Sequence, residues 1–242
     1  QGLAALQSLQ LLEGVDLAAI PVHSAEHLHL LIEVTKLAYA DRDRWVADPA
    51  QASLPVAALL DKAYAARRRT AFDPDKAQKY QWGDLDGDTT GFVVADGQGN
   101  VLSVIQSIYK SFGSTVVPPE TGVVLQNRGG YFNTDPAHPN CFAPRKRPFH
   151  TLLACVVTRD SWPVLGYATM GGDGQAMFHT QVLTNLLDYG MEVQEAIERP
   201  RFVCGPIDPG DVRDAVRIEA RVPAPVRDAL IGRGHQVEVV SD

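Results

Sequence analysis

The 242-residue sequence lacks three features that each mark a particular class of protein. No apolar run approaches the roughly 20 residues that a membrane-spanning helix needs. Basic residues are not in excess, and the formal net charge of -7 disfavours nucleic acid or an anionic membrane surface as the main partner. No secretory signal peptide opens the chain. These absences predict a soluble protein with no nucleic-acid and no membrane partner. They leave the compartment open, with the cytoplasm favoured over secretion because no signal is visible.

Cysteine is scarce, with only Cys141, Cys155 and Cys204 in the whole sequence. Their odd number and wide spacing indicate neither a disulfide framework nor a cysteine-based zinc site, so we expect three buried free thiols. The histidines at 23, 27 and 29 resemble a metal cluster. Positions 27 and 29 point to different sides of a helix, however, so we predict no metal.

The first 75 residues have helical patterning. Ser24 is positioned to cap a helix from Ala25 to about Ala47, and Pro55 to open a second helix that continues to Arg69. The chain begins with Gln1 inside such a pattern and stops in the middle of an apolar strand pattern. We therefore expect residues to be missing at both ends.

After residue 80 the pattern changes to short apolar runs separated by turns. The alternation predicts two hairpins, 92–107 and 152–170, with a turn at Asp96–Asn100 in the first. Helices are expected at 173–189, where Asp173 would be the cap, at 193–198 and at 226–232, and strands at 216–220 and 237–240. Hairpin strands with helices between them predict an α+β layered fold.

Thr89 and Thr90 lie between an acidic, glycine-containing loop and an apolar strand. A threonine hydroxyl is a weak nucleophile unless a base lies beside it. Cleavage of the Asp88–Thr89 bond would give Thr89 a free α-amino group, whose pKa of about 8 suits a general base. Without cleavage, Thr89 is an ordinary strand residue. Both interpretations follow from the local sequence.

Four further segments carry polar side chains at strand ends or loops. Ser107 lies on the strand that would pair with the threonine strand. Residues 125–132 form a polar loop, and residues 146–151 precede an apolar strand. In residues 170–175 the backbone N–H groups of the glycines could face a developing oxyanion at a helix N-terminus. The glycine spacing does not fit a dinucleotide-binding motif, and no cofactor is predicted.

Taken in order, these segments resemble the γ-glutamyltransferase (γ-glutamyltranspeptidase) family of N-terminal-nucleophile hydrolases. The resemblance rests on the threonine pair, the Asp96–Asn100 turn, the Asn127 loop, residues 146–148 and the glycine pair at 171–172. It implies an αββα sandwich, of which this chain holds a part. It also implies that residues 1–88 are the C-terminal part of a large subunit and residues 89–242 the catalytic small subunit, both made from one precursor.

The resemblance further implies roles for individual residues. Thr89 would be the nucleophile released by autocatalytic cleavage, supported by Thr90 and Ser107. Gly171 and Gly172 would form the oxyanion hole. The positions that contact the donor substrate would be those of Tyr109, Arg128, Tyr131, His150 and Thr151.

This sequence departs from typical transpeptidases at the donor site. The third residue of the nucleophile motif is Gly91 rather than histidine, and Tyr109 and Tyr131 stand where typical members carry an asparagine and an aspartate. Arg128 replaces a neutral amide. Such a site should favour a carboxylate or an uncharged acyl group over an ammonium. This pattern is similar to the branch that contains oxamate amidohydrolase and γ-glutamyltransferase-like acylases.

The sequence therefore predicts an amidohydrolase or acyltransferase that acts on small amides through an acyl-enzyme. The alternative is an unprocessed, inactive relative that acts as a binding or scaffold subunit. Neither the residue pattern nor the family resemblance decides whether the protein forms a homo-oligomer.

Overall fold

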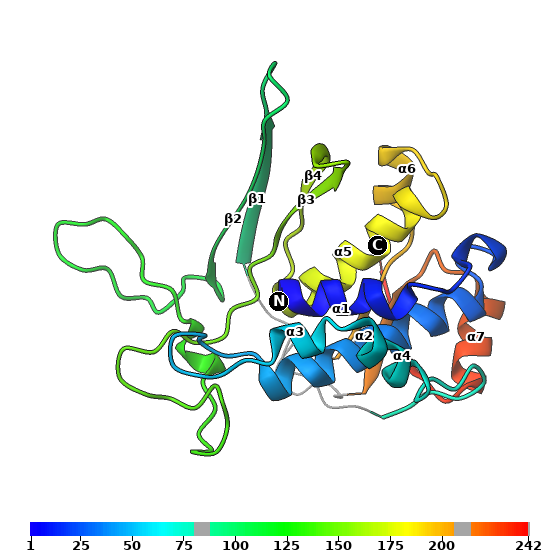
Figure 1. Cartoon of the computed structure of the whole chain (residues 1–242), viewed down its shortest axis with the longest axis horizontal. Coiled ribbons are helices and arrows are strands. Elements are labelled where there is room, and N and C mark those ends of the chain that lie inside the picture. The colour runs from blue at the N-terminus through cyan, green and yellow to red at the C-terminus, as the bar shows by residue number, and fades with distance from the viewer. Residues whose placement is uncertain (80–87, 206–213, 242) are drawn as a thin grey trace. The chain divides into compact units, whose positions relative to one another are not determined.

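The computed structural model describes residues 1–79, 88–205 and 214–241 (Figure 1). The chain forms two compact units. The hairpin unit comprises residues 1–2, 46–54 and 85–176, and the helical unit comprises residues 3–45, 55–84 and 177–242. Each unit contains sequence from both sides of Thr89, so the proposed cleavage site is not the boundary between them. The mixture of helices and strands confirms the α+β class.

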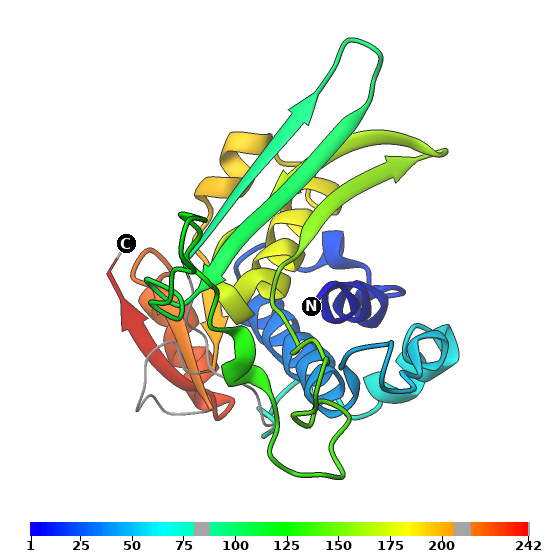
Figure 2. The ribbon, with the colours of Figure 1, turned by 90° about the vertical axis from the view of Figure 1, so that its left-hand side faces the viewer.

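The hairpin unit contains both predicted hairpins (Figure 2). The first pairs β1 (Asp88–Ala95) with β2 (Val101–Tyr109), and the second pairs β3 (Ala154–Arg159) with β4 (Trp162–Ala168), both antiparallel. The Asp96 side chain closes the first turn by accepting hydrogen bonds from the Gln98 and Asn100 N–H groups, each at 2.9 Å. The expected Asp96–Asn100 turn is thus confirmed.

The two hairpins pack against each other at two glycines. A Cβ atom on Gly91 would lie 2.8 Å from the Ala168 Cβ, and one on Gly166 would lie 2.8 Å from the Val93 Cγ1. Real Cβ atoms do not approach one another so closely, so both positions favour glycine. Gly91, which departs from the histidine of typical transpeptidases, is therefore suited to the close packing of β1 on β4.

Loops and two short 3₁₀ turns complete the hairpin unit. These turns are η2 (Arg128–Tyr131) and η3 (Gly172–Gly174). The buried Asp48 carboxylate accepts from the Arg147 backbone N–H at 3.0 Å and from its Nη2 at 2.8 Å. These hydrogen bonds from Arg147 hold the pKa of Asp48 well below its usual range. They fix the segment that leads to residues 150 and 151.

The helical unit contains the predicted helix at residue 25. This helix, α2 (Ala25–Trp45), begins where the Ser24 Oγ accepts from the His27 N–H at 3.2 Å, as expected of a cap. The continuous helix expected from Pro55 to Arg69 is wrong. The Asp61 carboxylate instead caps a new helix by accepting from the Tyr64 N–H at 2.9 Å. The segment is thus divided into α3 (Val56–Leu59) and α4 (Lys62–Arg69).

The remaining helices are α1 (Gly2–Leu12), the 3₁₀ turn η1 (Leu17–Ala19), α5 (Gln175–Leu187), α6 (Val193–Glu198) and α7 (Ala224–Gly232). Helix α5 begins at Gln175 and not directly after a cap at Asp173, because η3 intervenes and the Asp173 side chain is bonded elsewhere. Among the described residues, no helix is both long and apolar enough to cross a membrane.

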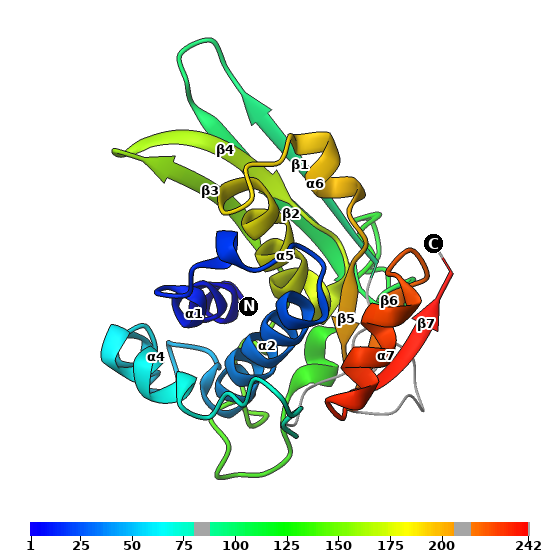
Figure 3. The same ribbon diagram turned by 90° about the vertical axis from the view of Figure 1, so that its right-hand side faces the viewer.

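A three-stranded sheet supports this unit (Figure 3). β5 (Phe202–Cys204) pairs antiparallel with β6 (Ala215–Glu219), which pairs parallel with β7 (Gln236–Val240) after the α7 crossover. Sequence patterning missed β5, whose three residues are too few to show a period. Phe202, Ile218 and Leu230 are among the most buried apolar side chains here.

The three cysteines are free thiols, as expected, but only Cys204 is buried. Cys141 and Cys155 are partly exposed, so the expectation of three buried thiols is wrong for these two. Cys141 follows a loop, and Cys155 lies on β3, a strand whose alternate residues are exposed.

Candidate functional site

Thr89 lies near the start of β1, at a point where the strand is irregular. The register shifts between Asp88 and Thr89, and Thr89 then pairs with Ser107 on β2. The Thr89 and Ser107 hydroxyl oxygens are 3.1 Å apart, as the hairpin pairing predicts. Thr89 is only 7% exposed. Its hydroxyl is thus held on the inner side of the hairpin, next to a second hydroxyl that can orient it.

Ser107 connects Thr89 to the next part of the site. Its Oγ also accepts a hydrogen bond from the Tyr109 N–H at 2.9 Å. Tyr109 is buried and has a φ of 77°, a backbone conformation that is uncommon for a residue with a side chain. Strained backbone of this kind is concentrated at functional sites.

Thr90 is placed differently from Thr89. It pairs with Gln106, is exposed, and as the next residue on the strand it points to the opposite face. The structure therefore does not bring its side chain to the Thr89–Ser107 pair, and its supporting role stays a prediction. The acidic loop before Asp88 lies outside the described residues.

Arg128 is a buried cation with incomplete hydrogen bonding. Only 4% of the residue is exposed, and its Nη1 donates to the Thr151 Oγ1 at 3.0 Å. Its guanidinium carbon lies 5.2 Å from the centre of the Tyr109 ring. The Nε and Nη2 atoms have no hydrogen-bond partner among the described residues. Burial lowers the pKa of Arg128 from its usual value, so an anion at these two nitrogens would be strongly favoured.

The two tyrosines of the expected donor site lie together. The rings of Tyr109 and Tyr131 are 4.7 Å apart, and Phe149 packs edge-on against Tyr131 at 5.3 Å. Thr151 is buried beside Arg128, whereas His150 is exposed. The structure thus gathers Tyr109, Arg128, Tyr131 and Thr151, and it leaves His150 at the surface.

The predicted oxyanion glycines form the turn that precedes α5. Gly171 has a φ of 112° and Gly172 a φ of 51°, both in the left-handed region that favours glycine. The Gly174 N–H donates to the Gly171 carbonyl at 2.8 Å and closes the turn. The next side chain, the fully buried Asp173, accepts a hydrogen bond from the Tyr131 hydroxyl. The glycine turn and the tyrosines therefore belong to one bonded cluster.

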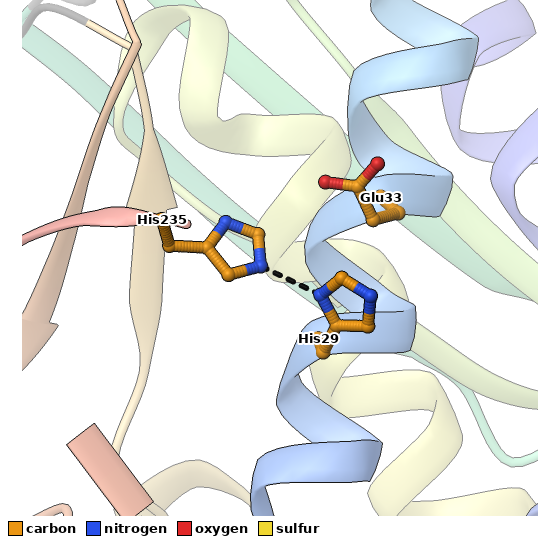
Figure 4. Close-up of side chains that lie close together, drawn as sticks. All are labelled: His29, Glu33 and His235. Carbon is orange, nitrogen blue, oxygen red and sulfur yellow. Dashed lines mark hydrogen bonds between the residues drawn. The ribbon is translucent and has the colours of Figure 1, made fainter. Parts of the chain in front are cut away.

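A second buried polar group lies in the helical unit and involves one of the histidines considered for a metal (Figure 4). Ligand-type atoms of His29, Glu33 and His235 lie within 4.8 Å of one another. The His29 Nδ1 is 2.7 Å from the His235 Nε2, and the His29 Nε2 is 2.8 Å from the Asp73 carbonyl. Since a carbonyl can only accept, His29 carries its proton on Nε2 and accepts from His235 through Nδ1.

Lys36 completes this group and gives it a structural character. Its Nζ donates to the Glu33 carboxylate at 2.9 Å and lies 3.4 Å from the His235 Nδ1. Burial is the main cause that lowers the pKa of His29, and it lowers the pKa of His235 to about 3. Both imidazoles are thus neutral. The Lys36 ammonium lies beside them, and its positive charge would repel a divalent metal ion. We describe the group as a closed hydrogen-bond network.

Comparison with known proteins identifies the family. The model of the γ-glutamyltranspeptidase family matches residues 1–242. The chain belongs to this family. The glutathione hydrolase-like YwrD proenzyme of Bacillus subtilis is 40% identical over 244 residues, which cover 100% of this chain and 46% of the relative. The oxamate amidohydrolase proenzyme of Klebsiella pneumoniae is 36% identical over 242 residues, covering 100% of this chain and 45% of the relative.

The solved structures agree with this assignment. A cephalosporin acylase from Bacillus halodurans superposes with a TM-score of 0.88 and 35% sequence identity, covering 100% of this γ-glutamyltranspeptidase-family chain and 43% of the acylase. This match confirms the expected fold class, that of the N-terminal-nucleophile hydrolases, with part of the fold in this chain. The chain spans less than half the length of these relatives. The relatives are enzymes, which gives no support to the alternative of an inactive scaffold.

Sequence reasoning missed one member of the cluster, since it assigned Asp173 only to a helix cap. Its partner Tyr131 is 42 residues away, and no local pattern connects the two. The only signal was its position next to the glycine pair. His235 was missed for the same reason, because it lies 206 residues from His29.

Proposed function

We propose that this chain is the catalytic portion of an N-terminal-threonine amidohydrolase or acyltransferase. The proposal rests chiefly on the buried Thr89 hydroxyl, held 3.1 Å from Ser107 directly after the irregular step at Asp88. The proenzyme relatives support the idea that a precursor is cut. Hydrolysis of the Asp88–Thr89 bond converts the Thr89 amide nitrogen into an amine. That amine supplies the base that the uncut chain lacks.

The reaction follows from these groups. The Thr89 Oγ1 attacks the substrate carbonyl carbon while the Thr89 amine takes the hydroxyl proton. The Gly171 and Gly172 N–H groups stabilise the resulting oxyanion. The C–N bond then breaks, the amine returns the proton to the leaving nitrogen, and an ester remains on Thr89. Water or an acceptor amine attacks this ester, releases the acyl group and restores the hydroxyl.

Arg128 selects the acyl group in this proposal. Its Nε and Nη2 atoms, which have no partner in the described part of the chain, form one edge of the guanidinium. A carboxylate binds such an edge through two parallel hydrogen bonds. The Nη1 atom is already held by Thr151. The preferred donors are therefore small amides whose acyl part carries a carboxylate and no α-amino group, because an ammonium would meet Arg128 as a like charge.

The test of catalysis is made on the full-length protein. Intact-mass analysis should find two polypeptides divided before Thr89, and a reactive amide or ester substrate should leave its acyl mass on the peptide that begins at Thr89. Turnover of an amide by a protein that stays uncut would contradict the mechanism.

The test of selectivity compares kcat/KM for matched glutaryl, γ-glutamyl and pentanoyl anilides. The glutaryl substrate should be preferred, and Arg128→Ala should lower its kcat/KM by a factor on the order of a hundred or more, with little change for the neutral pentanoyl substrate. Arg159→Ala removes the same charge from an exposed strand end and serves as control. A preference for the γ-glutamyl substrate would contradict the selectivity while leaving Thr89 as the nucleophile.

A further inference from the structure

Two segments of the candidate site are joined by a partly buried hydrogen bond that the proposed chemistry does not use. The Tyr131 hydroxyl, at the end of η2, donates to the carboxylate of Asp173, which directly follows the glycine pair. Burial and the negative charge of Asp173 raise the pKa of Tyr131 above its usual range. Tyr131 therefore keeps its proton and remains a donor at every physiological pH.

The glycine turn needs such an anchor. Glycine provides the left-handed φ angles that residues 171 and 172 require, but it has no side chain to fix the backbone. Asp173 is held on both sides: its carboxylate by Tyr131, and its carbonyl by the Gln1 Nε2 at 2.6 Å. The first residue after the glycines is thus held at two points, one on its side chain and one on its backbone.

The other end of this connection lies in the Arg128 pocket. Arg128 and Tyr131 are the first and last residues of the single turn η2. Tyr131 also packs against Tyr109, whose N–H donates to Ser107, the partner of Thr89. A continuous set of contacts therefore runs from the nucleophile through the acyl pocket to the glycine turn.

We propose that Tyr131 and Asp173 are positioning residues that hold the Gly171–Gly172 turn in register with the Arg128 pocket. This inference rests on the proposed function. Neither residue touches the reacting atoms; each acts through the glycine N–H groups. Because a displacement of about 1 Å in a catalytic group can cost on the order of a hundredfold in rate, loss of this hydrogen bond should reduce kcat.

The experiment is a double-mutant cycle on the processed full-length enzyme with Tyr131→Phe, Asp173→Ala and the double variant. Each single change should lower kcat about tenfold or more for both glutaryl and pentanoyl anilides and should leave the ratio of their kcat/KM values unchanged. The double variant should be no slower than the slower single variant, because both changes remove one interaction. Asp173→Asn, which keeps an acceptor for the Tyr131 hydroxyl, should retain most of the kcat.

Ser103→Ala is the matched control. It removes a hydrogen bond of similar burial in the same unit, from the Ser103 hydroxyl to the Tyr167 carbonyl at 2.9 Å. Its kcat should remain near that of the wild type. Additive effects in the cycle, or a selective loss of the glutaryl substrate through KM, would overturn the proposal, the latter by showing that Tyr131 binds substrate.

A second measurement separates this inference from the proposed function. The same cycle is run on thermal unfolding in an uncleaved Thr89→Ala background. Coupling between Tyr131 and Asp173 should appear there, independent of turnover. If the stability effects of the two changes are coupled but the wild-type enzyme does not turn over amides, only the proposed function is contradicted. Additive stability effects would contradict the positioning link even if the enzyme is active.

Discussion

The hairpin unit and the helical unit both bury charged side chains, but they satisfy them differently. In the hairpin unit, Arg128 leaves two guanidinium nitrogens without a partner among the described residues. In the helical unit, Lys36 is bonded to Glu33 and to His235, and His235 is bonded in turn to His29. Unpaired nitrogens on a buried guanidinium are suited to bind an anion, whereas paired buried charges are suited to a structural role.

The largest expected effect lies in the hairpin unit, where one change should abolish most of the activity and leave the stability nearly unchanged. Thr89→Ala should lower kcat/KM for amide substrates by at least about a thousandfold, because it removes the proposed nucleophile. The variant should stay a single polypeptide on a denaturing gel and unfold at nearly the wild-type temperature. Thr89→Ser keeps a hydroxyl and should still be cleaved. An active Thr89→Ala variant would place the nucleophile elsewhere.

The next effect concerns the helical unit and is expected in stability alone. Lys36→Met leaves the fully buried Glu33 carboxylate without its ammonium partner and should lower the free energy of unfolding by about 3 to 5 kcal/mol. Urea unfolding measures this change. Lys62→Met is the control, since Lys62 pairs with Glu13 but its side chain is 77% exposed, and the change there should be below about 1 kcal/mol. Equal losses of stability from the two changes would show that the buried Lys36–Glu33 pair contributes no more than the exposed Lys62–Glu13 pair.

The glycine turn provides a kinetic test of smaller size. Gly171→Ala forces a side chain onto a φ of 112° and should move one of the proposed oxyanion donors, lowering kcat on the order of a hundredfold. Gly97→Ala, at a hairpin turn with open space around its Cβ, should leave kcat unchanged. The comparison uses processed enzyme, with intact mass as the check. An unchanged kcat in Gly171→Ala would exclude this residue from the oxyanion hole.

The smallest expected effect is a difference in acid stability. Burial lowers the pKa of His235 to about 3 and that of His27 to about 4, from 6.5. Between pH 6.5 and these values the unfolded chain binds more protons than the folded one, so stability decreases as the pH falls through this window. His235 alone should account for about 1 to 2 kcal/mol between pH 7 and pH 5.

Asp48, in the hairpin unit, affects stability in a lower pH range. Its pKa is depressed, so its contribution is present above about pH 4 and is lost only as the pH falls further. Urea unfolding followed by hydrogen exchange should therefore show the helical unit losing protection first as the pH falls from 7 to 5. Simultaneous loss of protection in both units, or a free energy of unfolding that does not change between pH 7 and pH 5, would contradict the assignment of this pH dependence to the buried histidines.

Local sequence was sufficient for several elements. The Asp96–Asn100 turn set the register that places Ser107 beside Thr89, because hairpin pairing follows from the turn. Ser24 likewise determined where α2 begins. The prediction of a continuous helix from Pro55 failed because it overlooked Asp61, whose carboxylate caps a new helix inside the segment.

By itself, the sequence determined the threonine pair, the glycine pair, the unusual arginine and the family pattern that connects them. Only the tertiary structure decided which buried charges are satisfied. Asp173 meets Tyr131, and His29 meets His235, across separations of 42 and 206 residues, and no local periodicity encodes such pairs. The physical reason is that hydrogen-bond satisfaction depends on which distant segments pack together, whereas propensity and patterning act within a few residues along the chain.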